Sequence, residues 1–134
     1  MSYYLVSLGS NINAEVCLPK ALRLINKNYD VITQSSALTN PACGDHLKSP
    51  FHNQLLLLKS DDTQQQLKAH FEQLEIQLGR EKKSPARKFK DRTIDIDIVA
   101  QADTPQEALA TPLYESYNQQ LMKDWPLPAF LYNT

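Results

Sequence analysis

Apolar residues follow two kinds of spacing along the first hundred residues of the chain. Short runs rich in Tyr, Val, Ile and Leu are typical of strands, and apolar residues three or four positions apart are typical of one face of a helix. The elements predicted, in chain order, are a strand at 3–8, a helix carrying Leu18, Leu22 and Ile25, strands at 29–38 and 51–59, a helix carrying Leu67, Phe71, Leu74 and Leu78, and a strand at 93–100. The predicted order is therefore β-α-β-β-α-β.

Residues that break or cap helices set the expected boundaries. Residues 9–11, Gly-Ser-Asn, predict a turn after the first strand. Proline fits best in the first turn of a helix, so Pro19 predicts that the first helix begins just before it. Asp61 and Asp62 offer carboxylates that cap the second helix, and Gly79 is expected to end it.

This order predicts an α+β fold of the ferredoxin-like, split βαβ type, an antiparallel sheet with both helices on one face. With 134 residues and 15.3 kDa, the chain is long enough for one hydrophobic core and too short for two. We therefore expect a single domain over 1–134 with its core in 3–100. Residues 39–50 are expected to form a loop, and the proline-rich residues 101–134 an irregular wrap around the sheet.

Composition excludes several classes of protein. Hydrophobic residues make up 42% and charged residues 22% of the chain, which is typical of globular rather than disordered proteins. No apolar run approaches the roughly 20 residues of a membrane span, and no signal peptide is expected at the start. Two cysteines, Cys17 and Cys43, are too few for a disulfide framework, so we expect a reduced, cytoplasmic setting.

The net charge of −1 conceals a basic segment at residues 80–92. Seven of the fourteen lysines and arginines lie there with two carboxylates, which leaves this segment at +5 and the rest of the chain at −6. A dense positive segment attracts an anion such as a phosphate or a nucleic acid. The alternative is a solvated surface loop.

Two carboxylates, Asp95 and Asp97, form an acidic pair on the last predicted strand. Because strand side chains alternate, Ile94, Ile96 and Ile98 share the face that enters the core. The acidic pair shares the other face, with about 7 Å between the two Cα atoms. Like charges this close favour a cation between them, and Mg²⁺ prefers oxygen ligands of this kind. The alternative is an ordinary solvent-facing pair.

The residues around the acidic pair favour phosphoryl transfer. Arg80 and Arg92 can each hold phosphate oxygens through paired hydrogen bonds, and without a GxxxxGK[ST] loop a nucleotide site must be built from side chains. Glu75 is either a ligand-binding carboxylate or a flanking charge. Phe51 and Asn53 share one face of the third strand and suit a flat heterocycle, which the ring stacks on and the amide hydrogen-bonds. The alternative is that Phe51 is a core residue and Asn53 a polar residue at a strand end.

Several of these segments together resemble a known family. They are Leu8-Gly9-Ser10-Asn11, Asn40-Pro41, Phe51-His52-Asn53, Glu75 with Gly79-Arg80, and the run from Arg92 to Ile98. From Tyr4 to Val99, and more weakly to about Leu127, the chain resembles 6-hydroxymethyl-7,8-dihydropterin pyrophosphokinase. This folate-pathway family transfers pyrophosphate from ATP to a pterin alcohol, and its fold is the ferredoxin-like arrangement predicted above.

The resemblance implies a role for each matching residue. Asp95 and Asp97 would be ligands of two Mg²⁺ ions that bridge the ATP phosphates, and Asn53 and Phe51 would hydrogen-bond and stack on the pterin. The other pterin-binding residues that it implies are Asn40, Pro41, Cys43 and Phe89. The implied nucleotide-binding residues are Glu75, Lys82, Arg92, Ile98 and Tyr114, and the implied catalytic residues are Arg80 and Arg92. ATP and a pterin are the expected partners, with neither a membrane nor a nucleic acid.

The chain departs from the family pattern at several positions. The replacements are Phe89 for a Trp, Lys90-Asp91 for Gly-Pro, Leu113 for a His, Gln119 for an Arg and Leu121 near an expected aromatic residue. The chain also ends earlier than is usual in the family. The metal site and half of the pterin pocket are expected to survive, and the nucleotide clamp to be weakened.

Three interpretations of function remain open. The first is an active pyrophosphokinase with weakened ATP affinity, supported by the intact acidic pair. The second is a paralogue that binds a pterin or a nucleotide without efficient transfer, supported by Leu113 and Gln119. The third is a module that binds RNA or another polyanion through residues 80–92. It ranks last because RNA-binding sheets rely on exposed aromatic side chains, and the first and fourth strands offer only Tyr3 and Tyr4.

Overall fold

The structure is a computed structural model that describes residues 2–10, 14–40, 51–78, 94–113 and 116–125. Its elements are β1 (Ser2–Ser10), α1 (Ala14–Asn28), β2 (Asp30–Gln34), β3 (Leu38–Asn40), β4 (Phe51–Ser60), α2 (Gln64–Gln77), β5 (Asp95–Ala102), α3 (Pro105–Leu109) and α4 (Ser116–Asp124). The strands pair antiparallel in the order β2-β4-β1-β5, and β3 pairs with β4 beyond the end of β2. This arrangement confirms the predicted α+β fold and the order of its six main elements.

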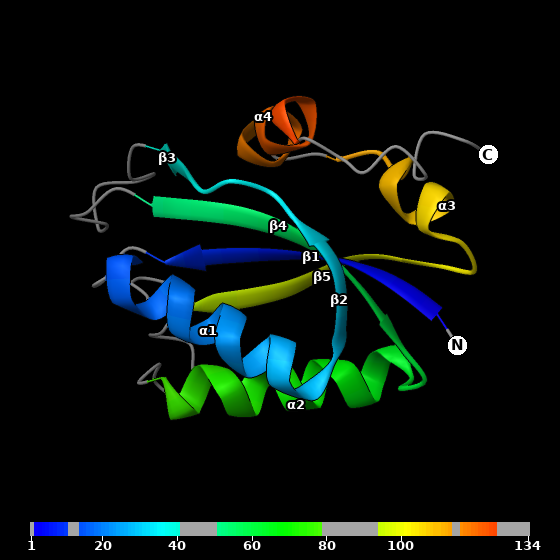
Figure 1. The fold of residues 1–134 in the computed structure, drawn as a ribbon, viewed down its shortest axis with the longest axis horizontal. Coiled ribbons are helices and arrows are strands. Elements are labelled where there is room, and N and C mark those ends of the chain that lie inside the picture. The colour runs from blue at the N-terminus through cyan, green and yellow to red at the C-terminus, as the bar shows by residue number, and fades with distance from the viewer. Residues whose placement is uncertain (1, 11–13, 41–50, 79–93, 114–115, 126–134) are drawn as a thin grey trace, which may run out of the picture.

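Helices α1 and α2 cover one face of the sheet, as predicted (Figure 1). Alternate residues of the two central strands point to this face. The buried residues of this first core are Tyr4, Val6, Leu8, Leu18, Ala21, Ile25, Leu56, Leu58, Leu67, Phe71, Ile94 and Ile96. The two isoleucines confirm the alternation predicted for the last strand, which directs the acidic pair to the opposite face.

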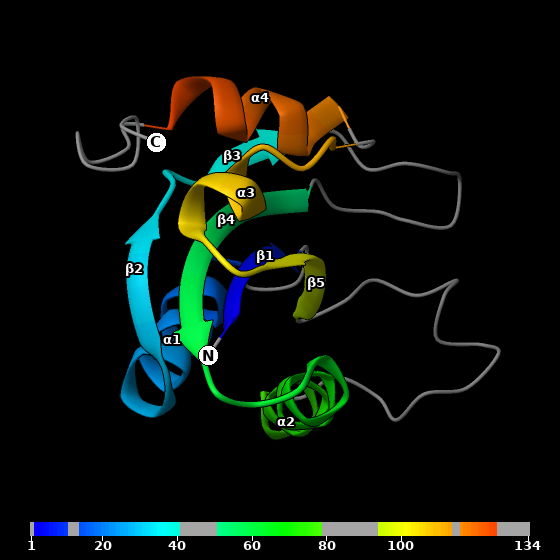
Figure 2. The ribbon, with the colours of Figure 1, turned by 90° about the vertical axis from the view of Figure 1, so that its right-hand side faces the viewer.

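Helices α3 and α4 cover that opposite face, so the irregular wrap predicted for 101–134 is wrong where the structure describes it (Figure 2). Pro105 lies at the first position of α3, where the missing N–H costs nothing, and the Thr104 hydroxyl accepts a hydrogen bond from the Glu107 N–H (3.2 Å). Pro105 marks a helix boundary rather than the absence of helix. No helix in the described ranges is long and apolar enough to cross a bilayer.

The covering of both faces explains the uninterrupted apolar run in β4. Leu55 and Leu57 belong to a second core with Leu5, Ala108, Leu121 and Trp125. Leu56 and Leu58 belong to the first core, and all four leucines are fully buried. A strand that is buried on both faces has no polar positions to alternate with its apolar ones.

Two predicted boundaries in the first thirty residues are wrong. Helix α1 begins at Ala14, five residues before Pro19, because burial of Cys17 and Leu18 stabilises the earlier turn at the cost of one missing backbone donor. Strand β1 continues through Gly9 and Ser10, which were predicted to turn. Gly9 pairs with neighbouring strands on both sides, and those pairs keep it extended.

The strand predicted at 29–38 is divided into β2 and β3, and β3 includes Thr39 and Asn40, which were predicted to lie in a loop. Ser35 lies at the break. Its N–H donates to the Leu55 carbonyl (2.8 Å), and its hydroxyl accepts from the Leu55 N–H (2.9 Å). A side-chain oxygen thus replaces one backbone acceptor of the ladder, which ends the regular strand there.

The cap of α2 also differs from the prediction. The N-cap is Thr63, whose hydroxyl accepts from the Gln66 N–H (3.1 Å) while the Gln66 side chain accepts from the Thr63 N–H (2.9 Å). This reciprocal capping box satisfies two N–H groups at once. The Asp62 carboxylate is therefore not a cap but faces Tyr29 and His70. Gly79, the predicted end of the helix, lies outside the described residues.

Candidate active site

Three polar side chains predicted from distant segments lie on one face of three adjacent strands. In the strand register, Gly9 of β1 is opposite Asn53 of β4 on one side and Asp95 of β5 on the other. Residues directly opposite each other in a sheet share a face, and two strand spacings separate the outer Cα atoms by about 10 Å. Asp97 follows in the next row, opposite Ser7. The acidic pair and the Asn53 amide therefore border one surface.

The middle strand carries small residues at the centre of this face. Gly9, between Asn53 and Asp95, has no side chain, and a Cβ at this position would project between them. Ser7 has a short side chain, and its hydroxyl donates to Asn118 Oδ1 (3.1 Å). The row Asn53-Gly9-Asp95 thus places an amide and a carboxylate on either side of a residue without a side chain.

The carboxylates of the acidic pair fit a magnesium ion that takes some of its ligands from the protein and the others from a substrate. Asp97 is exposed and Asp95 half-buried. Within the described ranges, no three His, Cys, Asp or Glu side chains are grouped so that they could hold a metal. A metal at the acidic pair would take its remaining ligands from elsewhere. Mg²⁺ is commonly bound in this way, through one or two carboxylates together with water and substrate phosphates.

Asn53 carries an unsatisfied buried donor. Its side chain is 4% exposed, and within the described residues its Nδ2 has no hydrogen-bond partner. Such a group costs about 1–3 kcal/mol of stability. A bound ligand that offers an acceptor to Nδ2 would recover this energy. The finding favours a ligand-binding role for Asn53 over an ordinary polar residue at a strand end.

If the ligand is the pterin that the family resemblance implies, 6-hydroxymethyl-7,8-dihydropterin, replacement of Asn53 by alanine is expected to weaken its binding by about 1–3 kcal/mol, since the ligand acceptor then loses its buried partner. Isothermal titration calorimetry measures this loss. The matched control is Asn26→Ala, because the Asn26 amide is exposed and donates within α1, to the Leu22 carbonyl (2.8 Å). Equal pterin affinity in the parent and the Asn53 variant would remove Asn53 from the site.

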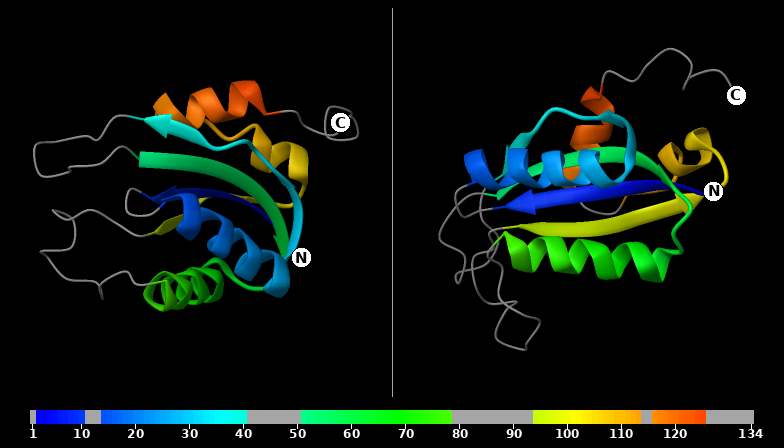
Figure 3. Two further views of the ribbon diagram at one scale, coloured as in Figure 1. Left: turned by 60° about the vertical axis from the view of Figure 1, so that its left-hand side comes forward. Right: turned by 60° about the horizontal axis from the view of Figure 1, so that its bottom comes forward.

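Glu75 lies on α2, which runs beside β5 (Figure 3). It is 5% exposed, and its Oε2 accepts a hydrogen bond from the Ile96 N–H (2.7 Å). Ile96 is the residue between the two carboxylates of the acidic pair. Of the two predicted alternatives, a flanking charge is wrong, because the carboxylate is buried and bonded to the backbone of β5. Its predicted contact with a nucleotide stays a prediction.

The remaining predicted site residues are only partly described. Ile98 packs against the first core, on the face opposite to the acidic pair. The backbones of Asn40 and Phe51 are paired across β3 and β4, next to the row of Asn53, and nothing is described of their side chains. The predicted site residues outside the described residues are Pro41, Cys43, Arg80, Lys82, Phe89, Arg92 and Tyr114.

Residues near the C-terminus that depart from the family pattern contact one another or the second core. The Gln119 Nε2 donates to the Leu113 carbonyl (2.7 Å), Leu113 packs against the second core, and Leu121 is buried in it. Asn118 was not predicted from the sequence. It is buried, and its side chain accepts a hydrogen bond from the Ser7 hydroxyl, which lies opposite Asp97 in the sheet. No local signal predicts this contact, because its partners lie 111 residues apart.

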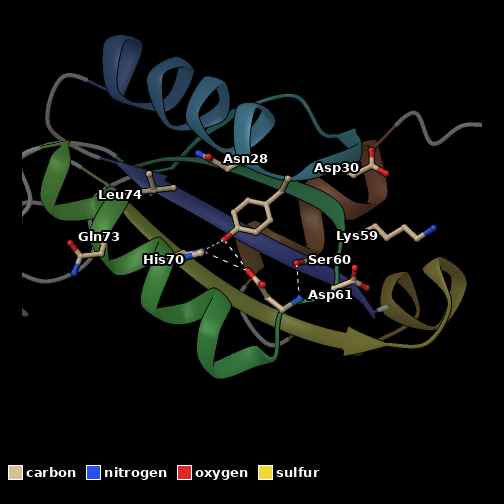
Figure 4. A pocket seen from close by; sticks show the side chains of 10 residues that line it. Asn28, Asp30, Lys59, Ser60, Asp61, His70, Gln73 and Leu74 are labelled. Atoms are coloured by element: carbon tan, nitrogen blue, oxygen red, sulfur yellow. Dashed lines mark hydrogen bonds and ion pairs between the residues drawn. The ribbon is translucent and has the colours of Figure 1, made fainter.

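A cavity of about 630 Å³ lies at the other end of the sheet, where β1 begins and β4 ends (Figure 4). The Tyr29 hydroxyl lies 2.5 Å from His70 Nδ1 and donates to Asp62 Oδ2 (3.4 Å). The Tyr4 hydroxyl donates to the Asp62 carbonyl (2.7 Å). These bonds join the end of α1, the start of α2 and β1. We regard the cavity as separate from the candidate active site, because none of the predicted site residues that the structure describes lines it.

The Tyr29 contacts predict a loss of stability at alkaline pH. Burial and the Asp62 carboxylate raise the pKa of Tyr29 to about 12 from 10.0. Between these two values the unfolded chain releases the Tyr29 proton more readily than the folded chain, so stability falls as the pH rises from 10 to 12. The free energy of unfolding of Tyr29→Phe, measured with denaturant, should fall less steeply than that of the parent between pH 10 and 12. The fall should not vanish, because burial also raises the pKa of Tyr4. If absorbance measurements show that Tyr29 of the folded protein titrates near pH 10, the raised pKa and the predicted loss of stability are contradicted.

A protein-family model described as 7,8-dihydro-6-hydroxymethylpterin-pyrophosphokinase (HPPK) matches residues 5–124 of the 134-residue chain. The matched range includes Gly9, Asn53, the acidic pair and both C-terminal helices. The match confirms the resemblance inferred from the motifs.

Proposed function

The chain belongs to the 7,8-dihydro-6-hydroxymethylpterin-pyrophosphokinase family, and we propose that it transfers pyrophosphate from ATP to 6-hydroxymethyl-7,8-dihydropterin in the presence of Mg²⁺. The observation that carries the proposal is the row Asn53-Gly9-Asp95. An unsatisfied buried amide, which suits a heterocycle, and a carboxylate pair, which suits a metal-bound phosphate, border the same face about 10 Å apart at the Cα atoms.

In the proposed reaction, the hydroxymethyl oxygen of the pterin forms a bond to the β-phosphorus of ATP. The bond between that phosphorus and the oxygen bridging to the α-phosphorus breaks, AMP leaves with the bridging oxygen, and the hydroxyl proton passes to solvent. The protein mainly positions the two substrates and stabilises charge. Asn53 would hold the pterin edge, and Asp95 and Asp97 would hold Mg²⁺. When bound, Mg²⁺ would neutralise part of the negative charge of the phosphates.

The residues proposed to hold the rest of the substrates follow from the family resemblance. Arg80, Arg92 and Lys82 would hold phosphates and stabilise charge during transfer, and Phe51 would stack on the pterin. We further propose that Glu75, Ile98 and Tyr114 border the nucleotide, and that Asn40, Pro41, Cys43 and Phe89 border the pterin.

A second candidate function is a paralogue that binds a pterin or a nucleotide without efficient transfer. The observation that favours it is the contact between the two altered C-terminal positions. The Gln119 amide bonds to the Leu113 carbonyl, and Leu113 packs against the second core. Neither residue supplies the cationic or imidazole group that the family places there, so the nucleotide would be held by fewer charged groups.

The experiment that separates the two functions is AMP formation from Mg-ATP and the pterin by the full-length protein, with Asp97→Ala as the blank. AMP formed by the parent and absent from the variant would support pyrophosphoryl transfer. If the folded parent forms no AMP, calorimetry with the pterin alone and with Mg-ATP alone tests the paralogue. Salt-sensitive binding of generic RNA, with neither small molecule bound, would instead favour the polyanion module.

A further inference from the structure

We infer that Glu75 is a positioning residue for the acidic pair, which it orients through the backbone of Ile96; this inference rests on the proposed function. The carboxylate accepts the Ile96 N–H at 2.7 Å, and Ile96 is the residue between Asp95 and Asp97. Glu75 is thereby placed to act on the two metal-binding carboxylates through the strand that carries them, in addition to the border with the nucleotide proposed above.

The need for such a contact arises from the position of β5 at the edge of the sheet. Among the strands that the structure describes, β5 pairs with β1 alone, so alternate backbone N–H groups of β5 point away from these strands. Ile96 is 6% exposed, and a buried N–H without an acceptor is costly. Helix α2 lies along this edge and provides the acceptor (Figure 3).

The energetics favour a functional reason for a carboxylate at this position. Glu75 lies among Leu67, Phe71, Leu74 and Leu78, the apolar residues by which α2 packs on the sheet. Burial of a charged carboxylate there is expensive and is offset only by strong hydrogen bonds. An apolar residue in its place would avoid this cost but would leave the Ile96 N–H without the Glu75 acceptor. A buried acceptor directed at the residue between two metal-binding carboxylates is the arrangement expected of an orienting group.

The orientation of residues 95–97 depends on few neighbours along the chain, because Asp95 is the first residue of β5. On one side the segment is held by pairing with Gly9 and Leu8, and on the other by Glu75. Loss of the Glu75 contact would remove one of the restraints on this strand end, and a shift of the strand would carry both carboxylates with it. Small displacements of metal-binding groups weaken metal binding and slow the pyrophosphoryl transfer that depends on the metal.

The test compares Glu75→Leu, Glu75→Gln and the parent in equilibrium binding of α,β-methylene-ATP over a range of Mg²⁺ concentrations. Leucine fills the apolar stripe without an acceptor, whereas glutamine keeps an acceptor oxygen but no charge. We expect Glu75→Leu to raise the Mg²⁺ concentration needed for half-maximal binding about 10- to 100-fold, with unchanged pterin affinity. Glu75→Gln should restore most of this loss. Glu72→Ala, a half-buried carboxylate on the same helix, is the matched control.

A second readout follows the contact itself. Hydrogen exchange of the Ile96 amide, measured by NMR, should be slow in the parent and in Glu75→Gln and faster in Glu75→Leu. Lost protection at Ile96 with unchanged Mg²⁺ dependence would reduce the contact to a structural one and overturn the inference. A loss of nucleotide binding that is equal with and without Mg²⁺ would also overturn it, because that pattern indicates direct contact with the nucleotide.

The experiment distinguishes a failure of this inference from a failure of the proposed function. If the parent shows no Mg²⁺-dependent nucleotide binding, the proposed function fails before any variant is compared, and the positioning role fails with it. If the parent binds and Glu75→Leu has the same Mg²⁺ dependence, only the positioning role fails. Denaturant unfolding of each variant identifies any loss of binding that comes from a loss of fold.

Discussion

Replacement of Asp97 by alanine is expected to abolish Mg²⁺-dependent nucleotide binding and to reduce AMP formation by at least about 100- to 1,000-fold, the usual cost of removing one group that stabilises the transition state. Asp97 is exposed and lies on the sheet face away from the first core, so the variant should keep its fold. Pterin affinity should also be kept, because Asn53 lies two strands away in the neighbouring row.

Asp103→Ala is the control for this experiment. Asp103 is also exposed and follows directly after β5, but it lies at the other end of that strand from the acidic pair. Nucleotide binding is measured by calorimetry with and without Mg²⁺, and AMP by chromatography. Undiminished nucleotide affinity in Asp97→Ala would refute the metal-binding assignment of the acidic pair.

Replacement of Trp125 by alanine is expected to destabilise the protein by about 3–5 kcal/mol, the cost of removing a large buried aromatic side chain. Trp125 is 4% exposed at the end of α4, and its Nε1 donates to the Thr33 hydroxyl (3.3 Å). The residue thus joins the C-terminal segment to β2 across the second face of the sheet. A loss of this size is a large fraction of the stability of a typical domain.

The stability of Trp125→Ala is measured by urea unfolding followed by circular dichroism, because Trp125 is the only tryptophan of the chain and its fluorescence is lost with it. Lys123→Ala, an exposed change on the same helix, should alter stability by less than about 0.5 kcal/mol. An equally small change for Trp125→Ala would mean that α4 does not contribute to the core. The same variant should weaken nucleotide binding, since α4 brings Asn118 to Ser7 beside Asp97.

Two errors in the sequence predictions concern residues whose partners lie far away in the chain, and a third concerns a local helix cap. Pro19 was expected to start a helix, yet burial of Leu18 against the sheet stabilises the turn before it. Gly9 was expected to turn, yet its strand partners keep it extended. Asp62 has the chemistry of a helix cap, but Thr63 fills that position. For Pro19 and Gly9 a tertiary contact outweighs a local preference of about 1 kcal/mol, whereas the cap of α2 is a local motif formed by Thr63 and Gln66.

The sequence by itself determined the features that depend on local spacing. Alternation along residues 94–98 placed the isoleucines in the core and the acidic pair on the other face, because the period of a strand is two and admits no other arrangement. Helical spacing likewise identified α2 and its apolar face. The order of these elements indicated the α+β fold, since short connections leave few topologies open.

Only the tertiary structure decided which of these residues meet. The register of β4 and β5 against β1 places Gly9 between Asn53 and Asp95, and that register depends on packing across the whole sheet. The buried, unsatisfied Asn53 donor and the bond from Ile96 to Glu75 depend on how the layers stack. Burial and hydrogen bonding between distant segments are settled by the packed chain as a whole, because no local pattern of residue types encodes the distance between two strands or a strand and a helix.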